Sequence, residues 1–331
     1  MLMRNGLREE SMGYASAGTT EAGTIPIIDI RALRDGDDRK AVARELHRAS
    51  RDVGFIYVSH HGIDDAELAA VRDTALAFFR QPPELKEQVS VSSAHRGWLA
   101  RGGARMQDDA RADLKESFIF GHEETDGSLP DDHPLRGPNR WPDNMPELRD
   151  AALRYFEAAH DVAHQLMRGF ALGLDLDEDF FLKSTARPLS RASFVYYPPQ
   201  PEEMGREQFG VGPHTDFGVL TVLAQDSVGG LQVQHANGDW IAAPPVPGTL
   251  VINVGDLLAR WTNDEYRSTP HRVVNSSGRE RLSLVLAYDP EPQTRIDAGE
   301  IFPDAELHHE PITCGEYLEW RFARAFAYRN R

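Results

Sequence analysis

The chain has 331 residues, a hydrophobic content of 40% and a formal net charge of −16 at pH 7. This length allows one large domain or two small ones, and the composition is ample for a buried core. The negative charge argues against nucleic acid or an anionic membrane as a partner, since both require clustered Lys and Arg, and no apolar run approaches the roughly 18 residues of a membrane span.

The first half of the chain is expected to be mostly helical. Residues 1–23 are polar and rich in Gly, Ser and Thr, without the apolar stretch of a signal peptide, so we expect a flexible tail there. Residues 91–145 are rich in Gly, Arg, Asp and Pro and are expected to form loops with short strands. Apolar residues at helical spacing predict three helices, at about residues 38–50, 64–79 and 146–172.

From residue 190 the pattern changes to short alternating or apolar runs separated by Pro, Gly, Asn and Asp. The runs are SFVYY, VLTVLA, LQVQ, WIAAP, TLVINV, HRVVN and RLSLVLAY. Successive short strands without intervening helices favour an antiparallel sandwich or barrel over a parallel doubly wound sheet. A last helix is expected at about 315–328, with most of its aromatic residues packed on the barrel and one of them a candidate to border the pocket.

Three polar residues in this β-rich half form a candidate metal site. His214 and Asp216 lie two positions apart in GVGPHTDFGVL, which reads as a strand, so their side chains are expected on one face. His271, from a second expected strand, would complete a triad of two histidines and one carboxylate. Such a triad leaves open positions on Fe(II) for a bidentate co-substrate and dioxygen.

Two further residues indicate a carboxylate-binding position. Arg281 and Ser283 lie two positions apart in the alternating run RERLSLVLAYDP and are expected to share one face of a strand. A guanidinium and a hydroxyl on that face would together bind a carboxylate.

These residues carry a resemblance to a known family. The chain resembles the isopenicillin N synthase-like branch of the Fe(II)/2-oxoglutarate-dependent oxygenases. The similar segments inside the β-rich half are SFVYYPPQP, PHTDFGVLTVLAQD, GGLQVQ, GDWIAAPPVPGTLVINVGD, RWTNDEYRSTPHRVV and RERLSLVLAYDP. Those before it are IPIIDI, VGFIYVSHHGI and DLKESFIFG.

The resemblance implies a mainly β fold with flanking helices around a double-stranded β-helix (jelly-roll) core. It also implies a single oxygenase domain over residues 24–331. Within it, a mostly helical part spans 24–189, the jelly-roll core with the iron site spans 190–295, and a C-terminal segment and helix span 296–331.

The implied activity is oxidation of a small molecule, by hydroxylation or related C–H chemistry, with succinate and CO2 as co-products. Its cofactors would be Fe(II), 2-oxoglutarate and O2. By resemblance, Arg281 and Ser283 bind the distal carboxylate of 2-oxoglutarate and Tyr197 touches the same molecule. The chain departs from the family at Val195, where asparagine is common, and Ser193 or Arg191 is a candidate substitute for that contact.

Candidate substrate contacts come from loops and strands that face the pocket in relatives. If two of the candidate arginines face the iron, an acidic substrate follows. The candidates are Arg96, Trp98, Arg101, Phe118, Phe120 and Arg191.

The sequence leaves three alternatives open: an iron-dependent oxidative cyclase that does not use 2-oxoglutarate, a barrel without catalysis, and a zinc hydrolase. The chain ends RFARAFAYRNR, without the tail glutamine of synthase-like relatives, which favours 2-oxoglutarate. The single cysteine, Cys314, cannot form an internal disulfide, which fits a reducing cytoplasm, and it is expected to be a small, partly buried side chain. A monomer is the expected state.

Overall fold

The computed structural model of the protein describes residue 17 and residues 25–36, 38–103, 113–123, 133–200 and 209–326. The tail expected over residues 1–23 falls outside these ranges except for residue 17. Among the residues that the structure describes, no helix combines the length and the apolar composition that a bilayer span requires.

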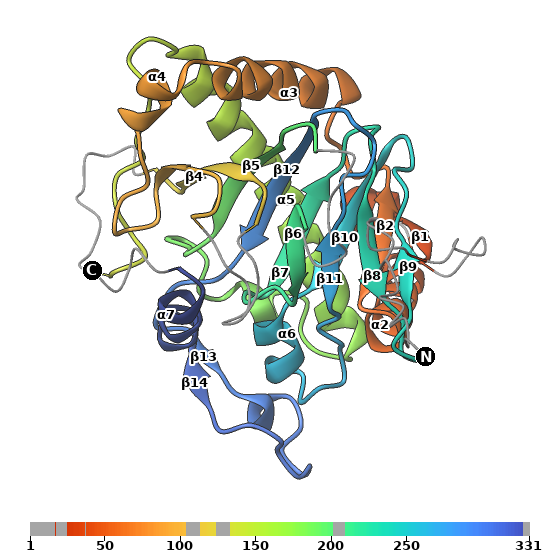
Figure 1. Cartoon of the computed structure of the whole chain (residues 1–331). Coiled ribbons are helices and arrows are strands. Elements are labelled where there is room, and N and C mark those ends of the chain that lie inside the picture. Colours follow the sequence, from red (N-terminus) through yellow and green to blue (C-terminus); the bar gives the residue numbers. More distant parts are fainter. Residues whose placement is uncertain are drawn as a thin grey trace, which may run out of the picture.

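Two β-sheets form the centre of the molecule (Figure 1). The larger sheet has eight strands in the order β1-β2-β10-β7-β12-β5-β4-β3. Its pairs are antiparallel except for β1 and β2. The strands span Ile27–Asp29 (β1), Phe55–Ser59 (β2), Gly97–Leu99 (β3), Glu116–Gly121 (β4), Arg191–Tyr197 (β5), Leu220–Ala224 (β7), Thr249–Val254 (β10) and Arg281–Tyr288 (β12).

The smaller sheet has four antiparallel strands in the order β6-β11-β8-β9. They span Val211–His214 (β6), Leu231–Gln234 (β8), Trp240–Ala242 (β9) and His271–Val273 (β11). Apolar side chains of both sheets, among them Val195, Val211 and Val273, pack together in one cluster. The two sheets are the double-stranded β-helix that the family resemblance implies. A separate pair, β13 (Arg295–Ile296) and β14 (Ile312–Thr313), precedes the last helix.

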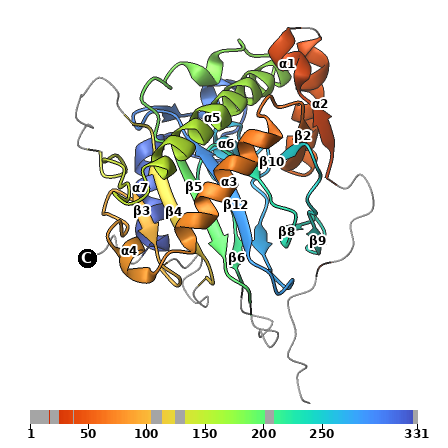
Figure 2. The same ribbon diagram turned by 90° about the horizontal axis from the view of Figure 1, so that it is seen from above.

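Helices cover one face of the larger sheet (Figure 2). The long helix α5 packs against β7 and β12, and α3 packs against β5 and β12. The helices span Arg31–Asp35 (α1), Arg39–Asp52 (α2), Asp65–Phe79 (α3), Pro83–Glu87 (α4), Glu147–Gly173 (α5), Asp256–Trp261 (α6) and Cys314–Ala325 (α7), with short 3-10 turns at Phe180–Leu182 and Ala298–Glu300.

The three long helices expected before residue 190 are confirmed as α2, α3 and α5, and the C-terminal helix as α7, which ends three residues earlier than predicted. The side chain of Asp64 accepts a hydrogen bond from the Ala66 N–H and so caps α3. The sequence missed α6, a helix of 6 residues between two strands. Cys314 is fully buried, whereas the sequence predicted a partly buried side chain.

Alternation along the larger sheet separates two environments. On β12, Leu282, Leu284 and Leu286 belong to the core under the helices, whereas Arg281, Ser283 and Val285 line a cavity on the opposite face. The antiparallel partner β5 repeats this division. The polar side chains of β12, Arg281 and Ser283, therefore lie on the face of the sheet that is turned away from the helices.

A close backbone approach fixes the chain that leads into β11. Gly54 has φ +73, and a Cβ there would overlap the carbonyl oxygen of Arg267. The Thr269 hydroxyl donates to the Val53 carbonyl at 2.7 Å, on the same stretch of chain. Because His271 lies two residues after Thr269, Gly54 helps to set the position of that histidine.

Gly54→Ala should therefore destabilise the protein more than Gly238→Ala. Gly238 has φ +92, but no atom lies within 4 Å of the position that a Cβ would take. Both variants therefore have the strain of an alanine in the left-handed region, and only in Gly54→Ala does the new Cβ also overlap the Arg267 carbonyl oxygen. We expect an additional loss of about 1–3 kcal/mol in the free energy of unfolding, measured by denaturant titration. Equal losses in the two variants would show that the close approach relaxes freely.

Candidate active site

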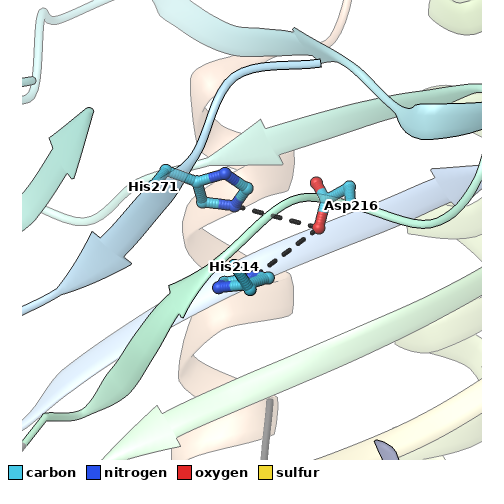
Figure 3. A group of neighbouring side chains, drawn as sticks. All are labelled: His214, Asp216 and His271. Carbon is cyan, nitrogen blue, oxygen red and sulfur yellow. Dashed lines mark ion pairs between the residues drawn. The ribbon is translucent and has the colours of Figure 1, made fainter. Parts of the chain in front are cut away.

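His214 and His271 face each other across two neighbouring strands. His214 is the last residue of β6 and His271 the first of β11, and the antiparallel register pairs them directly. Their ring centroids lie 4.3 Å apart. Both imidazoles point toward one position between the strands (Figure 3).

Asp216 reaches the same position from a loop. The sequence placed it on one strand with His214, which is wrong, because β6 ends at His214. Its Oδ1 lies 3.7 Å from His214 Nε2 and 3.8 Å from His271 Nε2 (Figure 3). One ligand atom from each of the three residues lies within 4.8 Å of the other two. The turn after the strand thus brings the carboxylate back over both rings.

Backbone carbonyls orient the two imidazoles. His214 Nδ1 lies 2.9 Å from the Gly212 carbonyl oxygen, and His271 Nδ1 lies 3.2 Å from that of Thr269. When each Nδ1–H donates to its carbonyl, the Nε2 lone pair is left facing the third ligand.

The larger sheet holds the carboxylate. Thr221 Oγ1 donates to Asp216 Oδ2 at 2.6 Å, and Asn253 Nδ2 donates to the same oxygen at 2.8 Å. Both hydrogen bonds fall on Oδ2, so Oδ1 is the oxygen left toward the histidines. The residues present therefore fit a monodentate carboxylate ligand beside two imidazole nitrogens.

Electrostatics favour the protonation states that bind a metal. Burial lowers the pKa of His214, and the neighbouring His271 lowers it further, so the His214 ring is neutral at neutral pH. Burial raises the pKa of Asp216, but the two histidines and the donors Asn253 and Thr221 outweigh it, and the net shift is downward. Two nitrogens and one oxygen are a donor set for Fe(II), and zinc accepts it too.

The triad lines a cavity of about 200 Å³, and Arg281 and Ser283 line the same cavity. Arg281 is 1% exposed, and its Nε donates to the Gly229 carbonyl oxygen at 2.6 Å. Its guanidinium carbon lies 4.6 Å from the centre of the Tyr197 ring. Among the described residues, neither Arg281 Nη1 nor Ser283 Oγ has a hydrogen-bond partner. Buried donors without partners are costly, so a ligand with acceptor oxygens would stabilise this corner.

Of the six candidate substrate residues, only Arg191 lines the cavity. Phe118 and Phe120 are fully buried in the core under the helices, where they pack on Trp141. On β4 it is Ser117 and Ile119 that line the cavity instead. The expected positions on β4 were therefore wrong by one residue, and on a strand a shift of one residue moves a side chain to the opposite face of the sheet.

The remaining three candidates lie elsewhere. The Trp98 Nε1–H donates to Glu116 at 2.8 Å, outside the cavity lining. Arg96 is buried and donates to the His95 carbonyl at 3.1 Å, and Arg101 is exposed. The acidic-substrate expectation required two arginines of this set at the cavity, and that condition is not met.

Arg191 is also too far from Arg281 to replace the contact expected at Val195. On β5, Tyr197 pairs with Arg281, whereas Arg191 pairs with Ala287 at the other end of β12. Six residues of strand separate the two positions, or about 20 Å. Ser193 does line the cavity, nearer to Val195.

Sequence analysis missed several residues of the site. Thr221 and Asn253 are polar positions within otherwise apolar strand runs, and that interruption is the signal that could have found them. Lys115 also lines the cavity and was missed. Phe322 and Phe326 line it as well, where one aromatic residue of the last helix was expected. Lys115 lies in the DLKESFIFG segment, but no local pattern shows that it points toward the cavity.

Thr221→Val should weaken metal binding, because it removes a hydrogen bond to Asp216 Oδ2 while keeping the shape of the side chain. We expect the dissociation constant for Fe(II), titrated anaerobically, to rise about 10-fold or more. Thr221→Ser retains the hydroxyl and serves as the control. Unchanged affinity in the valine variant would show that Asn253 alone holds the carboxylate.

Comparison with known proteins agrees with this geometry. The family model of the 2OG-Fe(II) oxygenase superfamily matches residues 190–290, and that of the non-haem dioxygenase N-terminal region (named for morphine synthesis) matches residues 25–144. A 2-oxoglutarate-Fe(II) type oxidoreductase of Metarhizium majus, ppzC, is 37% identical, covering 91% of this chain and 87% of the relative. A 1-aminocyclopropane-1-carboxylate oxidase of Dictyostelium discoideum is 32% identical, covering 91% and 95%.

Among solved structures, a full-length Neurospora crassa protein in complex with alpha-KG superposes with a TM-score of 0.83 at 31% identity, covering 93% of this chain and 98% of that one. The chain therefore belongs to the 2-oxoglutarate- and Fe(II)-dependent oxygenase superfamily and is an oxygenase that uses Fe(II), 2-oxoglutarate and O2 on a small molecule.

Proposed function

We propose that His214, Asp216 and His271 are the iron ligands of this oxygenase. The observation that carries the proposal is the convergence of His214 Nε2, His271 Nε2 and Asp216 Oδ1 in a cavity that also contains unpartnered buried donors. When bound, Fe(II) would supply the redox centre that couples decarboxylation of 2-oxoglutarate to C–H oxidation. The protein's part is to position the substrate and to exclude water.

We also propose that Arg281, Ser283 and Tyr197 bind the distal carboxylate of 2-oxoglutarate. The Gly229 carbonyl fixes Arg281 Nε and the Tyr197 ring supports its guanidinium, so Nη1 is already oriented. Burial raises the pKa of the Tyr197 hydroxyl, which stays protonated and able to donate. A carboxylate here would satisfy Arg281 Nη1 and Ser283 Oγ together.

Compartment and oligomeric state are finer points of the proposal. A single, fully buried cysteine supports a reducing compartment, for which we propose the cytoplasm. For the oligomeric state we propose a monomer, as expected from the sequence.

Arg281→Ala should raise the dissociation constant for 2-oxoglutarate about 100-fold or more, because a desolvated carboxylate would lose its cation. Binding is measured anaerobically from the visible absorption of the Fe(II) enzyme on adding 2-oxoglutarate, with Fe(II) affinity measured separately. Arg279→Ala changes an exposed arginine just before β12 and is the control. An unchanged dissociation constant in the Arg281 variant would remove Arg281 from this role.

The stoichiometry of succinate separates the oxygenase from the oxidative cyclase alternative, which retains the Arg-x-Ser pair. We expect one succinate per substrate oxidised. We also expect succinate release to increase with substrate, because turnover without a positioned substrate is slow. Substrate oxidation without succinate, measured by chromatography of the same reaction, would favour the cyclase.

A further inference from the structure

The cavity has a second end, away from Arg281. Arg191 and Ala287 pair with each other at the far ends of β5 and β12, and both line the cavity. Arg191 is 7% exposed, so most of its guanidinium is enclosed by protein. This end is the part of the cavity left for substrate when 2-oxoglutarate lies against Arg281.

Three phenylalanines wall this end; we call Phe217, Phe322 and Phe326 the aromatic wall. Phe217 directly follows the ligand Asp216, and its ring centroid lies 5.8 Å from that of Phe322. Phe322 and Phe326, at the end of α7, stack at 5.2 Å. All three line the cavity, so a flat ring bound beside the metal position has aromatic faces and edges to pack against.

Arg191 already has a counter-charge. Its Nη2 lies 3.3 Å from Asp289 Oδ2, and Asp289 is fully buried. Asp289 Oδ1 accepts from the Val219 N–H at 3.1 Å. Burial raises the pKa of Asp289 and Asp216 adds to the rise, whereas Arg191 and the Val219 N–H oppose it, and the net shift is upward. A protonated Oδ2–H would set a donor against the donor-only guanidinium, so the carboxylate form is the one that fits. Arg191 thus lines the cavity as the cationic member of an ion pair with Asp289, and the pair has no net charge.

The guanidinium keeps donors for a ligand. An arginine has five N–H groups. The partners of Arg191 among the described residues are Asp289 and the Leu189 carbonyl, the latter at 3.5 Å, and its planar face lies over Phe322, 4.5 Å from the ring centre. The N–H groups left over belong to a side chain that lines the cavity.

The described Asp, Lys and Arg residues of the site cancel in pairs, and the remaining titratable residue of this end, His95, packs on Phe322 and Phe326. Lys115 lies 3.7 Å from Asp113, as Arg191 pairs with Asp289. Arg281 offsets Asp216, and a ferrous ion would offset the two charges of 2-oxoglutarate. An anionic substrate would then add an unmatched charge to a buried site, which is strongly unfavourable.

We propose that the substrate is a neutral molecule with a flat aromatic or heteroaromatic ring and a carbonyl-type oxygen. The ring packs on the aromatic wall, and the oxygen accepts a hydrogen bond from Arg191. This inference rests on the proposed function, since the charge balance includes Fe(II) and 2-oxoglutarate.

The test uses matched probes on the anaerobic enzyme loaded with Fe(II) and 2-oxoglutarate. Benzamide and nicotinamide are neutral, benzoate and nicotinate are their anionic counterparts, and cyclohexanecarboxamide lacks the aromatic ring. Binding is followed by the change in visible absorption. Each aromatic amide should bind about 10-fold or more tightly than its acid, and benzamide more tightly than cyclohexanecarboxamide.

Asp289→Asn gives a result that a structural role alone would not produce. Asparagine keeps an oxygen for the Val219 N–H but leaves Arg191 uncompensated, so the preference should invert and benzoate should bind more tightly than benzamide. The double variant Arg191→Gln/Asp289→Asn removes both charges and leaves the site balanced again, so the preference for the amide should return.

Two outcomes would overturn the proposal without any variant: acids binding at least as tightly as their amides, or no response to either amide at millimolar concentration. Failure of the proposed function looks different, because then the visible band on adding 2-oxoglutarate would be absent before any probe is added.

Discussion

The antiparallel register of β6 and β11 is the constraint on which the site depends. It sets His214 opposite His271, so two imidazoles from distant parts of the chain share one position. The third donor, Asp216, is held by Thr221 and Asn253 of the other sheet. The metal position therefore lies where both sheets contribute, and a shift of either sheet would separate the ligands. This explains why the close approach at Gly54, which fixes the chain before β11, matters for chemistry as well as stability.

Side-chain alternation in the larger sheet distributes the remaining functions. One face of β4, β5 and β12 packs under the helices, and the other forms the cavity. Along the cavity face, Tyr197 and Arg281 lie at one end and Arg191 at the other. The proposed co-substrate and substrate ends are thus opposite ends of the same pair of strands, and the two histidines of the proposed metal site belong to the smaller sheet.

Two of the basic side chains that line this cavity form ion pairs with buried aspartates. Lys115 and Arg191 each have an aspartate partner, and only Arg281 keeps a buried nitrogen without a hydrogen-bond partner among the described residues lining the cavity. Arginine in a pocket is by itself a weak indicator of an acidic ligand, because a buried guanidinium needs a counter-charge in the free protein as well. Asp289 supplies the counter-charge of Arg191. We therefore infer a neutral hydrogen-bond acceptor as the ligand, and not an acid.

The sequence by itself determined the family, the main helices and strands, and the five polar residues His214, Asp216, His271, Arg281 and Ser283, because these depend on local periodicity and on residue type. It could not decide which face of β4 meets the cavity, so Phe118 and Phe120 were chosen where Ser117 and Ile119 lie. Tertiary structure alone showed that Thr221 and Asn253 hold Asp216 and that Asp289 neutralises Arg191. The physical reason is that face and partner are set by strand pairing between residues far apart in the chain, where a shift of one residue reverses every side chain.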